Sequence, residues 1–353
     1  MSKPPKVLFL TKYPTQGASS RYRVYQYLQD FKEIEFETQS LMSQEAFDLL
    51  YRKGSTKKKI WLSLKDYWQR LRFIIAHSDA DIFYMQRELF AFGPLWLEKI
   101  LRRQGKKLVF DLDDALFINK QNASNPFSWD KAARVIRIMQ QVDLVVAGNP
   151  WLAKQSLQLG AKQAVHIDVA EKVLFENEVR EGHLKALWLG SPTTSKYLKF
   201  IEQPLAKLQA EIDLSIEIVG GDSAHDFQFK ATYKDWTPQA ERLGLLTSHI
   251  GLMPLPDEDW SKGKCGGKAR TYMASGVVPV VSDIGYNQLL IDHGKRGFLC
   301  KTADDWKNAI LQLARNPELM TSIREEDYRY VKQHFSRTHI AQQLEKMLLD
   351  LVD

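Results

Sequence analysis

Short apolar runs alternate with longer segments of helical periodicity along most of the chain, and this alternation limits the fold more than any other feature. A short continuous apolar run is typical of a strand buried on both faces of a parallel sheet. Runs of this kind that alternate with helices predict parallel sheets covered by helices. We predict strands at Lys6–Leu10, Asp81–Met85, Lys107–Leu112, Val142–Gly148, Ala186–Gly190, Leu214–Gly221, His249–Leu255 and Val277–Asp283.

The segments between these runs carry helix signals. Asn149 stands at the cap position of one such segment, Pro150 lies in its first turn and Gly160 lies at its end, which is the usual order of capping residues. A second helix begins with Pro192. The other predicted helices are Arg21–Phe31, Gly93–Arg103, Lys268–Gly276, Asp304–Arg315 and Arg337–Val352, the last with Ile340, Leu344, Met347, Leu348 and Leu351 on one face.

The strand–helix pattern restarts near residue 185, after the polar and charged stretch at 170–183. Two domains also fit the length of 353 residues, since a domain has roughly 150 residues. We therefore predict an α/β protein of two Rossmann-like, doubly wound domains with a cleft between them. Ligands of such sheets bind at the carboxyl ends of the strands.

Charge and cysteine content narrow the class of partner. The net charge of +6 favours nucleotide phosphates, nucleic acid or an acidic membrane surface. We expect no nucleic acid, because the sequence has no helix-turn-helix, zinc-finger or RNA-recognition signature. Cys265 and Cys300 form no disulfide framework, and the apolar run Val7–Leu10 is too short for a signal peptide or membrane span. These features predict a cytoplasmic protein.

A glycine- and lysine-rich segment carries the strongest chemical signal. Gly263, Gly266 and Gly267 allow backbone amides to approach a ligand, and Lys264 and Lys268 add positive charge where a helix begins. Amides, helix dipole and ammonium groups together predict an anion site, although a solvated turn has the same composition. A Walker P-loop is excluded, since it needs four residues between its first glycine and the Gly-Lys pair and then a Ser or Thr; here Ala269 follows the lysine.

This segment is also where the chain resembles a known family. The stretch from Trp260 to Asn287, WSKGKCGGKARTYMASGVVPVVSDIGYN, resembles the donor-site signature of glycosyltransferase family 4, among the group 1 glycosyltransferases. Weaker similarity extends over nearly the whole chain, in SSRYRV, VFDLDDALF, ALWLGSPTTSKYL, HIGLMPL, HGKRGFL and DDWKNAI.

The resemblance implies a GT-B fold and a retaining transfer of a sugar without an obligatory metal or cofactor. Residues 1–175 would form the acceptor-side domain, 184–335 the domain that binds a UDP- or GDP-sugar, and 336–353 a helix that crosses back to the first domain. Family members commonly assemble bacterial surface polysaccharide or lipopolysaccharide, so the acceptor would be a glycan or a lipid-linked glycan. An inactive relative that only binds a nucleotide-sugar or a partner protein is the main alternative.

The resemblance also assigns donor-site roles. Lys268 is the first choice for the diphosphate and Lys264 the second, because without a metal, cationic groups must stabilise the charge on the leaving group. Many family members carry a glutamate pair with seven residues between its members, and a further acidic residue after the next strand. Those positions hold Gly263, Thr271 and Leu289 here. The remaining donor-site candidates are Gly190, Ser191, Thr193, Thr194, Gly266, Gly267, Thr271, Tyr286 and Asn287.

Candidates in the first domain follow its strands. Asp111, Asp113 and Asp114 lie at the end of a strand and are predicted to position sugar hydroxyls, with Asp113 and Asp114 as catalytic candidates. The string VFDLDDALF is also similar to the first motif of haloacid-dehalogenase-type phosphatases, in which the first Asp is the nucleophile. Gly17 in the first loop allows close approach to a ligand, and Arg21, with Arg23, would clamp a phosphate-bearing acceptor.

The segment Arg52–Ile75 is both basic and amphipathic. Its apolar and aromatic residues at helical spacing are Ile60, Leu64, Tyr67, Trp68, Leu71 and Ile75, and its basic residues are Lys57, Lys58, Lys59, Lys65, Arg70 and Arg72. Such a helix fits either the surface of its own sheet or an acidic bilayer. The second alternative would make the protein peripheral on the inner face of the cytoplasmic membrane.

Overall fold

The protein is described here by a computed structural model that covers residues 3–50, 54–90, 95–118, 128–174 and 182–352. The chain divides into two compact units. Unit 1 contains residues 1–170 and 337–353, and unit 2 contains residues 171–336. The first unit therefore includes the last helix of the chain, and the segment between the units lies within the polar stretch at 170–183.

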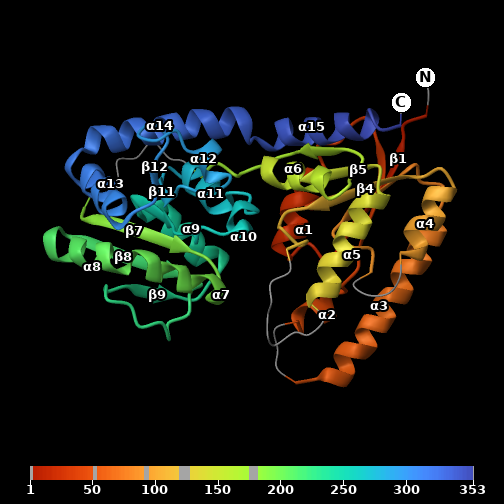
Figure 1. The fold of residues 1–353 in the computed structure, drawn as a ribbon, viewed down its shortest axis with the longest axis horizontal. Coiled ribbons are helices and arrows are strands. Elements are labelled where there is room, and N and C mark those ends of the chain that lie inside the picture. The colour runs from red at the N-terminus through yellow and green to blue at the C-terminus, as the bar shows by residue number, and fades with distance from the viewer. Residues whose placement is uncertain (1–2, 51–53, 91–94, 119–127, 175–181, 353) are drawn as a thin grey trace. The chain divides into compact units, whose positions relative to one another are not determined.

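Unit 1 is built on a parallel sheet with the strand order β2-β1-β3-β4-β5-β6. Its strands are β1 (Lys6–Thr11), β2 (Glu35–Ser40), β3 (Ile82–Gln86), β4 (Lys107–Leu112), β5 (Leu144–Ala147) and β6 (Ala164–His166). Its helices are α1 (Ala18–Arg23), the 3-10 helix η1 (Tyr25–Tyr27), α2 (Gln44–Asp48), α3 (Thr56–Ala76), α4 (Trp96–Arg103), α5 (Ser128–Gln141), α6 (Pro150–Gln158) and α15 (Arg337–Leu349) (Figure 1).

Helices cover both faces of this sheet. On one face Val7, Phe9 and Ile82 pack with Ile340 and Leu344 of α15 in one buried cluster. Successive side chains of a strand point to opposite faces, so the equally buried Leu8 and Leu10 belong to the other face, where α3, α4 and α5 lie (Figure 1). The C-terminal helix is therefore part of the core of unit 1.

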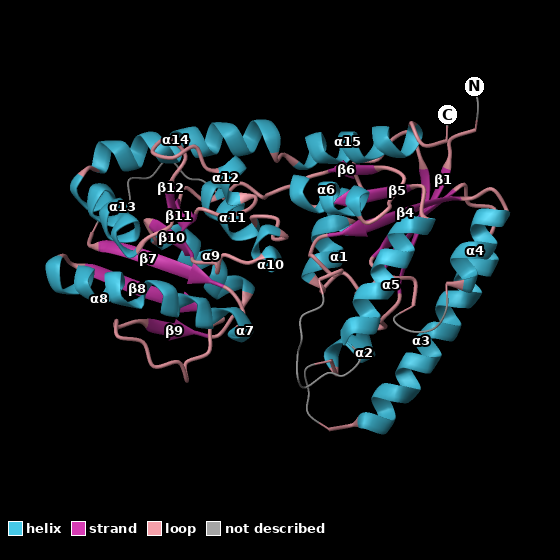
Figure 2. Ribbon diagram, in the orientation of Figure 1, coloured by secondary structure: helices cyan, strands magenta, loops and turns pink. Residues whose placement is uncertain are grey.

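Unit 2 repeats this plan with the strand order β12-β11-β10-β7-β8-β9, again all parallel. Its strands are β7 (Leu184–Leu189), β8 (Leu214–Val219), β9 (Thr232–Lys234), β10 (Ile250–Met253), β11 (Val278–Ser282) and β12 (Phe298–Cys300). Its helices are α7 (Pro192–Ser195), the 3-10 helix η2 (Lys196–Ile201), α8 (Glu202–Glu211), α9 (Pro238–Thr247), α10 (Asp259–Lys262), α11 (Gly267–Ala274), α12 (Asn287–Leu290), α13 (Ala303–Arg315) and α14 (Pro317–His334) (Figure 2).

Two buried clusters lie on the two faces of the second sheet. One joins Ile216 and Val280 to α8 and α13, and the other joins Leu187 and Val281 to α11 and α14. Both units are therefore doubly wound, and all eight predicted strands are confirmed.

The predicted helix Arg21–Phe31 is wrong in its length. Val24 leaves the helical region at φ −133°, and the chain continues only as the short 3-10 helix η1. The capped helix predicted after Asn149 is confirmed as α6, because the side-chain oxygen of Asn149 accepts a hydrogen bond from the amide of Leu152 at 2.7 Å. Residues 52–53 and 93–94, which begin two other predicted segments, lie outside the described residues.

Candidate functional site

The glycine-rich loop of unit 2 leads directly into helix α11. Gly266 has φ +64°, which favours glycine, and a Cβ atom there would lie 2.3 Å from the side chain of Leu290. Gly267 is the first residue of α11, is exposed, and would place a Cβ in open space. The backbone geometry therefore requires Gly266, whereas Gly267 leaves the first turn of the helix accessible.

Lys268 lies in this first turn and its ammonium group faces an aromatic ring. Its Nζ is 5.1 Å from the ring centroid of Trp188, at the carboxyl end of β7. Burial, with a smaller effect from the charge of Lys264, lowers the pKa of Lys268 to about 8. Among the described residues no carboxylate pairs with Lys268. An anion bound beside it would supply the counter-charge that the fold does not.

Lys264 precedes α11 and lies over another indole. Its Nζ is 4.6 Å from the ring centroid of Trp260 in α10. Its charge contributes to the lowered pKa of Lys268, so the two ammonium groups act on the same region. The two lysines that the sequence selects are therefore neighbours at the start of α11.

The loop after β7 meets this region through Trp188. A Cβ atom at Gly190 would lie 2.2 Å from the indole of Trp188, so the ring excludes a side chain there. The backbone amide of Ser191 donates to Thr194 Oγ1 at 3.3 Å, and the hydroxyl oxygens of Ser191 and Thr193 are 3.0 Å apart. This is the capping arrangement expected of the sequence. The hydroxyls of Ser191 and Thr193 also remain at the surface.

Thr271, the next donor-site candidate, is bound to a carboxylate from a distant part of the sequence. Its Oγ1 donates to Glu171 Oε2 at 3.3 Å, and Arg270 Nε lies 3.4 Å from Glu171 Oε1. Burial raises the pKa of Glu171 to about 7. Glu171 was not predicted as a site residue, because no sequence pattern near residue 171 indicates that its side chain reaches α11.

Two predicted donor-site residues have buried side chains. Asn287 is 2% exposed, and its Nδ2 donates to the carbonyl oxygen of Ser282 at 3.0 Å. Tyr286 is 7% exposed and packs in the cluster that contains Leu290. The side-chain amide of Asn287 thus supports the turn after β11, and a contact of either residue with the donor stays a prediction.

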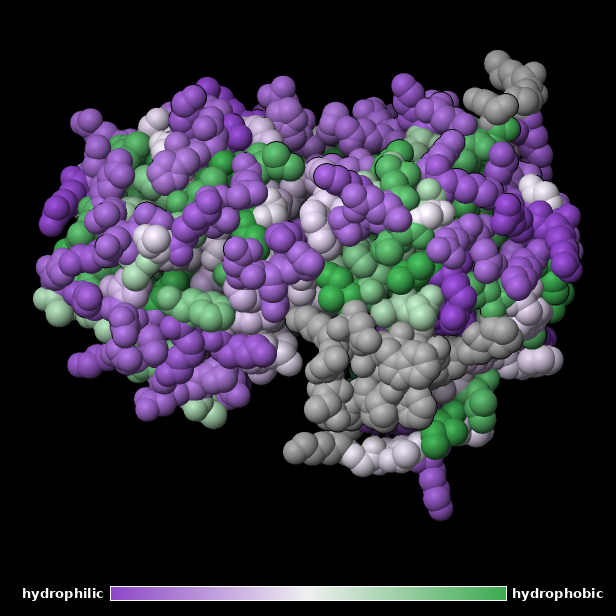
Figure 3. All heavy atoms as spheres, viewed as in Figure 1, coloured by the Kyte–Doolittle hydropathy of each residue, from purple (hydrophilic) through white to green (hydrophobic). Residues whose placement is uncertain are grey.

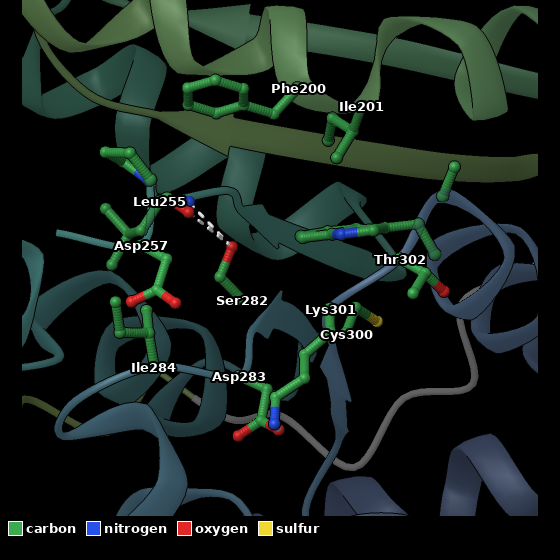
Figure 4. A pocket seen from close by; sticks show the side chains of 13 residues that line it. Phe200, Ile201, Leu255, Asp257, Ser282, Asp283, Ile284, Cys300, Lys301 and Thr302 are labelled. Carbon is green, nitrogen blue, oxygen red and sulfur yellow. Dashed lines mark hydrogen bonds and ion pairs between the residues drawn. The ribbon is translucent and has the colours of Figure 1, made fainter.

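A pocket of about 480 Å³ opens at the carboxyl ends of β10, β11 and β12. Figure 4 shows Phe200 and Ile201 of η2 above it, and Asp257, Ser282 and Asp283 on the opposite side. Trp306 of α13 adds a second aromatic wall. No residue of the segment from Lys264 to Lys268 is among the described residues that line this pocket. Tyr197, which stacks on Phe200 with 6.0 Å between centroids, is close enough to Glu258 and Lys264 for both charges to act on its pKa.

In unit 1, Asp111 is corrected from a site residue to a structural one. It is fully buried and forms a bidentate ion pair with Arg23 of α1, with Nε–Oδ1 at 2.9 Å and Nη2–Oδ2 at 3.0 Å. Tyr84 also donates to this carboxylate. Arg23 is thereby unable to clamp an acceptor phosphate, and its Nη1 donates to the carbonyl oxygen of Ile167 at 2.8 Å.

Asp113 and Asp114 instead form the acidic part of a polar cluster beyond β4. Arg87 Nη2 is 3.2 Å from Asp113 Oδ1 and 3.5 Å from Asp114 Oδ2. Ser19 of α1 donates to Asp113. The Arg87 guanidinium lowers the pKa of Asp113 against the opposing effect of burial. Arg87 itself has φ +68°, an uncommon conformation for a residue other than glycine.

Arg87 was not predicted as a site residue. The available signal was its position directly after β3, because Asp113 and Asp114 follow the neighbouring strand β4 in the same way. Gln86 completes the cluster, because its Nε2 donates to Ser19 Oγ at 2.9 Å and its Oε1 accepts from Ser20 Oγ at 2.8 Å. The cluster thus joins the carboxyl ends of β3 and β4 to the start of α1.

Gly17 and Arg21 each lie against a tyrosine, and their predicted roles at the acceptor stay predictions. A Cβ atom at Gly17 would lie 2.3 Å from the Cβ of Tyr13, so the close approach is to the protein itself. Arg21 lies with its guanidinium carbon 5.0 Å from the ring centroid of Tyr22 and is only partly buried. Among the described residues no group of three metal-ligating side chains occurs, and Cys265 and Cys300 form no disulfide.

Comparisons with known proteins identify a related family and a shared fold. Residues 183–316 match the family described as "Glycosyl transferases group 1", which confirms the resemblance for that part of unit 2. The chain is similar in structure to Anabaena HepE in complex with UDP-glucose, with a TM-score of 0.69, 15% identity, and coverage of 98% of this chain and 99% of the other. It is also similar to a Rickettsia africae glycosyltransferase, with a TM-score of 0.70, 16% identity, and coverage of 99% of each chain. For the sucrose-phosphate synthase of Thermosynechococcus elongatus the TM-score is 0.68 and the identity 14%, with coverage of 98% of this chain and 99% of the other. Curated proteins gave no match. The fold is thus that of the GT-B glycosyltransferases.

Proposed function

We propose that the protein is a glycosyltransferase that moves a sugar from a UDP- or GDP-sugar to a glycan or glycolipid acceptor with retention at the anomeric carbon. The observation that carries the proposal is Lys268, an ammonium group in the first turn of α11 with no carboxylate partner among the described residues. Helix dipole, open amides and this charge form an anion site suited to a diphosphate. The match of residues 183–316 to group 1 glycosyltransferases supports it.

Charge development explains why these groups suit the reaction. When the bond between the anomeric carbon and the diphosphate oxygen breaks, negative charge grows on the leaving diphosphate. Lys268 and Lys264 would stabilise that charge, and the hydroxyls of Ser191 and Thr193 would donate to phosphate oxygens. The proposed reaction needs no metal ion, because these cationic groups take the role that a metal has elsewhere.

The pocket at the carboxyl ends of β10, β11 and β12 has side chains that suit the nucleoside part of the donor. Its aromatic side chains Phe200 and Trp306 offer stacking and apolar surface, and the carboxylates of Asp257 and Asp283 offer acceptors for base and ribose. A volume of about 480 Å³ lies in the range of small-ligand pockets. We propose that base and ribose bind there, with the diphosphate directed toward Lys268.

Unit 1 would contribute the acceptor side. The carboxylates of Asp113 and Asp114 can accept hydrogen bonds from sugar hydroxyls, while Arg87 holds them in place. The ion pair between Asp111 and Arg23 argues against a haloacid-dehalogenase-type phosphatase. Asp111 would be the nucleophile in that mechanism, and here its side chain is buried against Arg23. We propose a glycan or lipid-linked acceptor and a place in the synthesis of surface polysaccharide or lipopolysaccharide, on the cytoplasmic side of the membrane.

An inactive nucleotide-sugar-binding relative is the second candidate. It is motivated by Gly263, Thr271 and Leu289, which stand where family members often carry acidic residues. However, Glu171 brings a carboxylate to Thr271 from another segment, so this side of the site keeps an acidic group. Transfer of sugar, or hydrolysis of the donor, would distinguish an enzyme from a binding protein.

Thermal unfolding with UDP, GDP, ADP and CMP, each with and without EDTA, tests the proposal. A ligand at about 100 times its dissociation constant adds about 2.7 kcal/mol, which shifts the midpoint by several degrees. We expect UDP or GDP to stabilise the protein despite EDTA, and Lys268→Ala to lose this effect. Lys295→Ala, at an exposed lysine elsewhere in unit 2, is the matched control. If no nucleotide stabilises the protein at millimolar concentration, the proposal fails.

A further inference from the structure

Helix α3 of unit 1 turns five of its large apolar side chains toward solvent. Ile60, Trp61, Leu64, Trp68 and Ile75 are 57%, 58%, 66%, 61% and 62% exposed. The side chains that α3 buries are Leu62, Asp66, Arg70 and Ile74, two of which are charged. A helix that only packs on its own sheet buries its apolar residues and exposes its charged ones. In α3 two charged residues are buried and five large apolar residues are exposed.

The buried charged residues fix this orientation. Asp66 Oδ2 accepts hydrogen bonds from the backbone amide and the hydroxyl of Ser43 at 3.1 and 3.2 Å. Arg70 Nη2 donates to the carbonyl oxygens of Thr11 and Gln39 at 2.6 and 3.1 Å. Arg70 therefore does not belong to the outer basic face as the sequence analysis expected. Rotation of α3 to hide its apolar residues would break all four hydrogen bonds and remove the partners that Asp66 and Arg70 provide to the backbone of Ser43, Thr11 and Gln39.

The exposed apolar residues form one continuous stripe. At roughly 100° per residue, the five exposed apolar residues and the partly buried Leu71 fall within a sector of about 100° along the whole helix. Apolar atoms reach the surface over the lower part of α3 in Figure 3. We call the exposed residues Ile60, Trp61, Leu64, Trp68 and Ile75 the α3 stripe. A stripe of this length on a surface helix marks an interaction site.

The charged residues around the α3 stripe indicate the chemistry of its partner. Lys57, Lys65 and Arg72 are exposed beside the α3 stripe, and the only acidic residue of the helix is the inward Asp66. Glu45 of α2 is paired with Lys58 of α3 at 2.7 Å. Lys65 also lies 5.3 Å from the ring centroid of Trp61. Tryptophan between lysine and aliphatic residues is the combination found at the headgroup level of bilayers.

Helix α4, on the same face of the sheet, shows the pattern independently. Its Trp96 and Ile100 are 44% and 40% exposed, and Lys99 and Arg103 lie beside them at helical spacing. Its only acidic residue, Glu98, is buried with Arg134 as its charged neighbour. Two helices on one face therefore each present tryptophan, isoleucine and basic residues, while every acidic side chain on them points inward.

We propose that this face of unit 1 docks on a lipid bilayer with anionic headgroups, with α3 lying in the plane of the interface. No described helix is both long and apolar enough to cross a bilayer, so the contact is with the surface. The apolar stripe enters the headgroup region, and Lys57, Lys65 and Arg72 contact the anionic lipids. The inference does not depend on the proposed catalytic activity.

Vesicle flotation of the full chain tests the proposal. We expect binding to vesicles of phosphatidylcholine mixed with phosphatidylglycerol, and much weaker binding to phosphatidylcholine alone. Trp61→Ser combined with Trp68→Ser should lower the partition coefficient about tenfold or more. Lys65→Gln combined with Arg72→Gln should remove most of the preference for the anionic vesicles and the sensitivity of binding to salt.

The matched control is Trp236→Ser combined with Leu243→Ser, two side chains of unit 2 with 50% and 52% exposure, which should bind as the native chain does. Equal binding by the Trp61 and Trp68 variant, or no binding to anionic vesicles, would overturn the proposal. Sedimentation velocity without lipid tests whether a second copy of the chain binds the α3 stripe instead. Self-association that is abolished by Trp61→Ser combined with Trp68→Ser would overturn the proposal in favour of an interface between two copies. Nucleotide stabilisation, measured without vesicles, should be unchanged in every variant.

Discussion

At the scale of single residues, the ammonium group of Lys268 connects the fold to the chemistry. Burial lowers the pKa of Lys268 to about 8. The group is therefore still mostly charged at pH 7, but it loses its proton within an accessible pH range. A bound diphosphate stabilises the charged form, so proton binding and nucleotide binding are coupled.

We therefore expect the affinity for UDP or GDP to be constant from pH 6.5 to about 7.5 and to fall about tenfold per unit above pH 8. Titration calorimetry across this range measures it. Lys268→Arg should remove the pH dependence up to pH 9, because an arginine keeps its charge there. A profile in the native protein as flat as that of the variant would contradict the role given to Lys268.

Asp111 provides a contrasting prediction, since its charge serves the fold. Asp111→Asn leaves the buried Arg23 without its ion-pair partner, and breaking such a pair typically costs about 3–5 kcal/mol. Urea unfolding should show this loss in free energy of unfolding. Asp114→Asn, at a half-buried member of the Arg87 cluster, should cost under about 1 kcal/mol. Similar losses for both substitutions would mean that Asp111 has no special structural role.

The site was predictable where its signals are local in sequence. Gly266, Gly267, Lys264 and Lys268 lie within five consecutive positions, and spacing alone indicates an anion site. Glu171 and Thr271 are 100 positions apart, and Asp111 and Arg23 are 88 apart. Pairings over such distances follow from the tertiary fold, so no local pattern could assign Glu171 to the site or remove Asp111 from it.

At the scale of elements, burial decided which strands could be predicted. Every predicted strand is an interior strand of its sheet, and the four missed strands, β2, β6, β9 and β12, are the four edges. Interior strands are covered on both sides and read as continuous apolar runs. Edge strands are short or mix polar and apolar residues, as in EFETQS of β2, so they resemble loops in sequence.

Helix α15 gives the prediction at this scale. Leu344 is 1% exposed in the core of unit 1, so Leu344→Ala should cost about 2–5 kcal/mol of unfolding free energy. Gln343→Ala, one position earlier at an exposed site, should change stability by under about 0.5 kcal/mol. Equal effects of the two substitutions in urea unfolding would show that α15 does not form part of the core in solution.

At the scale of the whole molecule, each unit has its own sheet and its own cores. Units of this kind often unfold separately. We expect calorimetry to resolve two transitions. UDP or GDP should raise the midpoint of one, and Leu344→Ala should lower the midpoint of the other. A single transition that both changes shift equally would show that the units unfold together.

The return of the chain to unit 1 also sets an order of events during protein synthesis. The ribosome completes residues 1–170, then residues 171–336, and only then the helix that covers Val7, Phe9 and Ile82. At roughly 5–20 residues per second, the intervening stretch takes on the order of 10–30 s. During that time one apolar face of the first sheet lacks the part of its cover that α15 supplies, so the newborn chain presents a binding surface to chaperones that the finished protein no longer has.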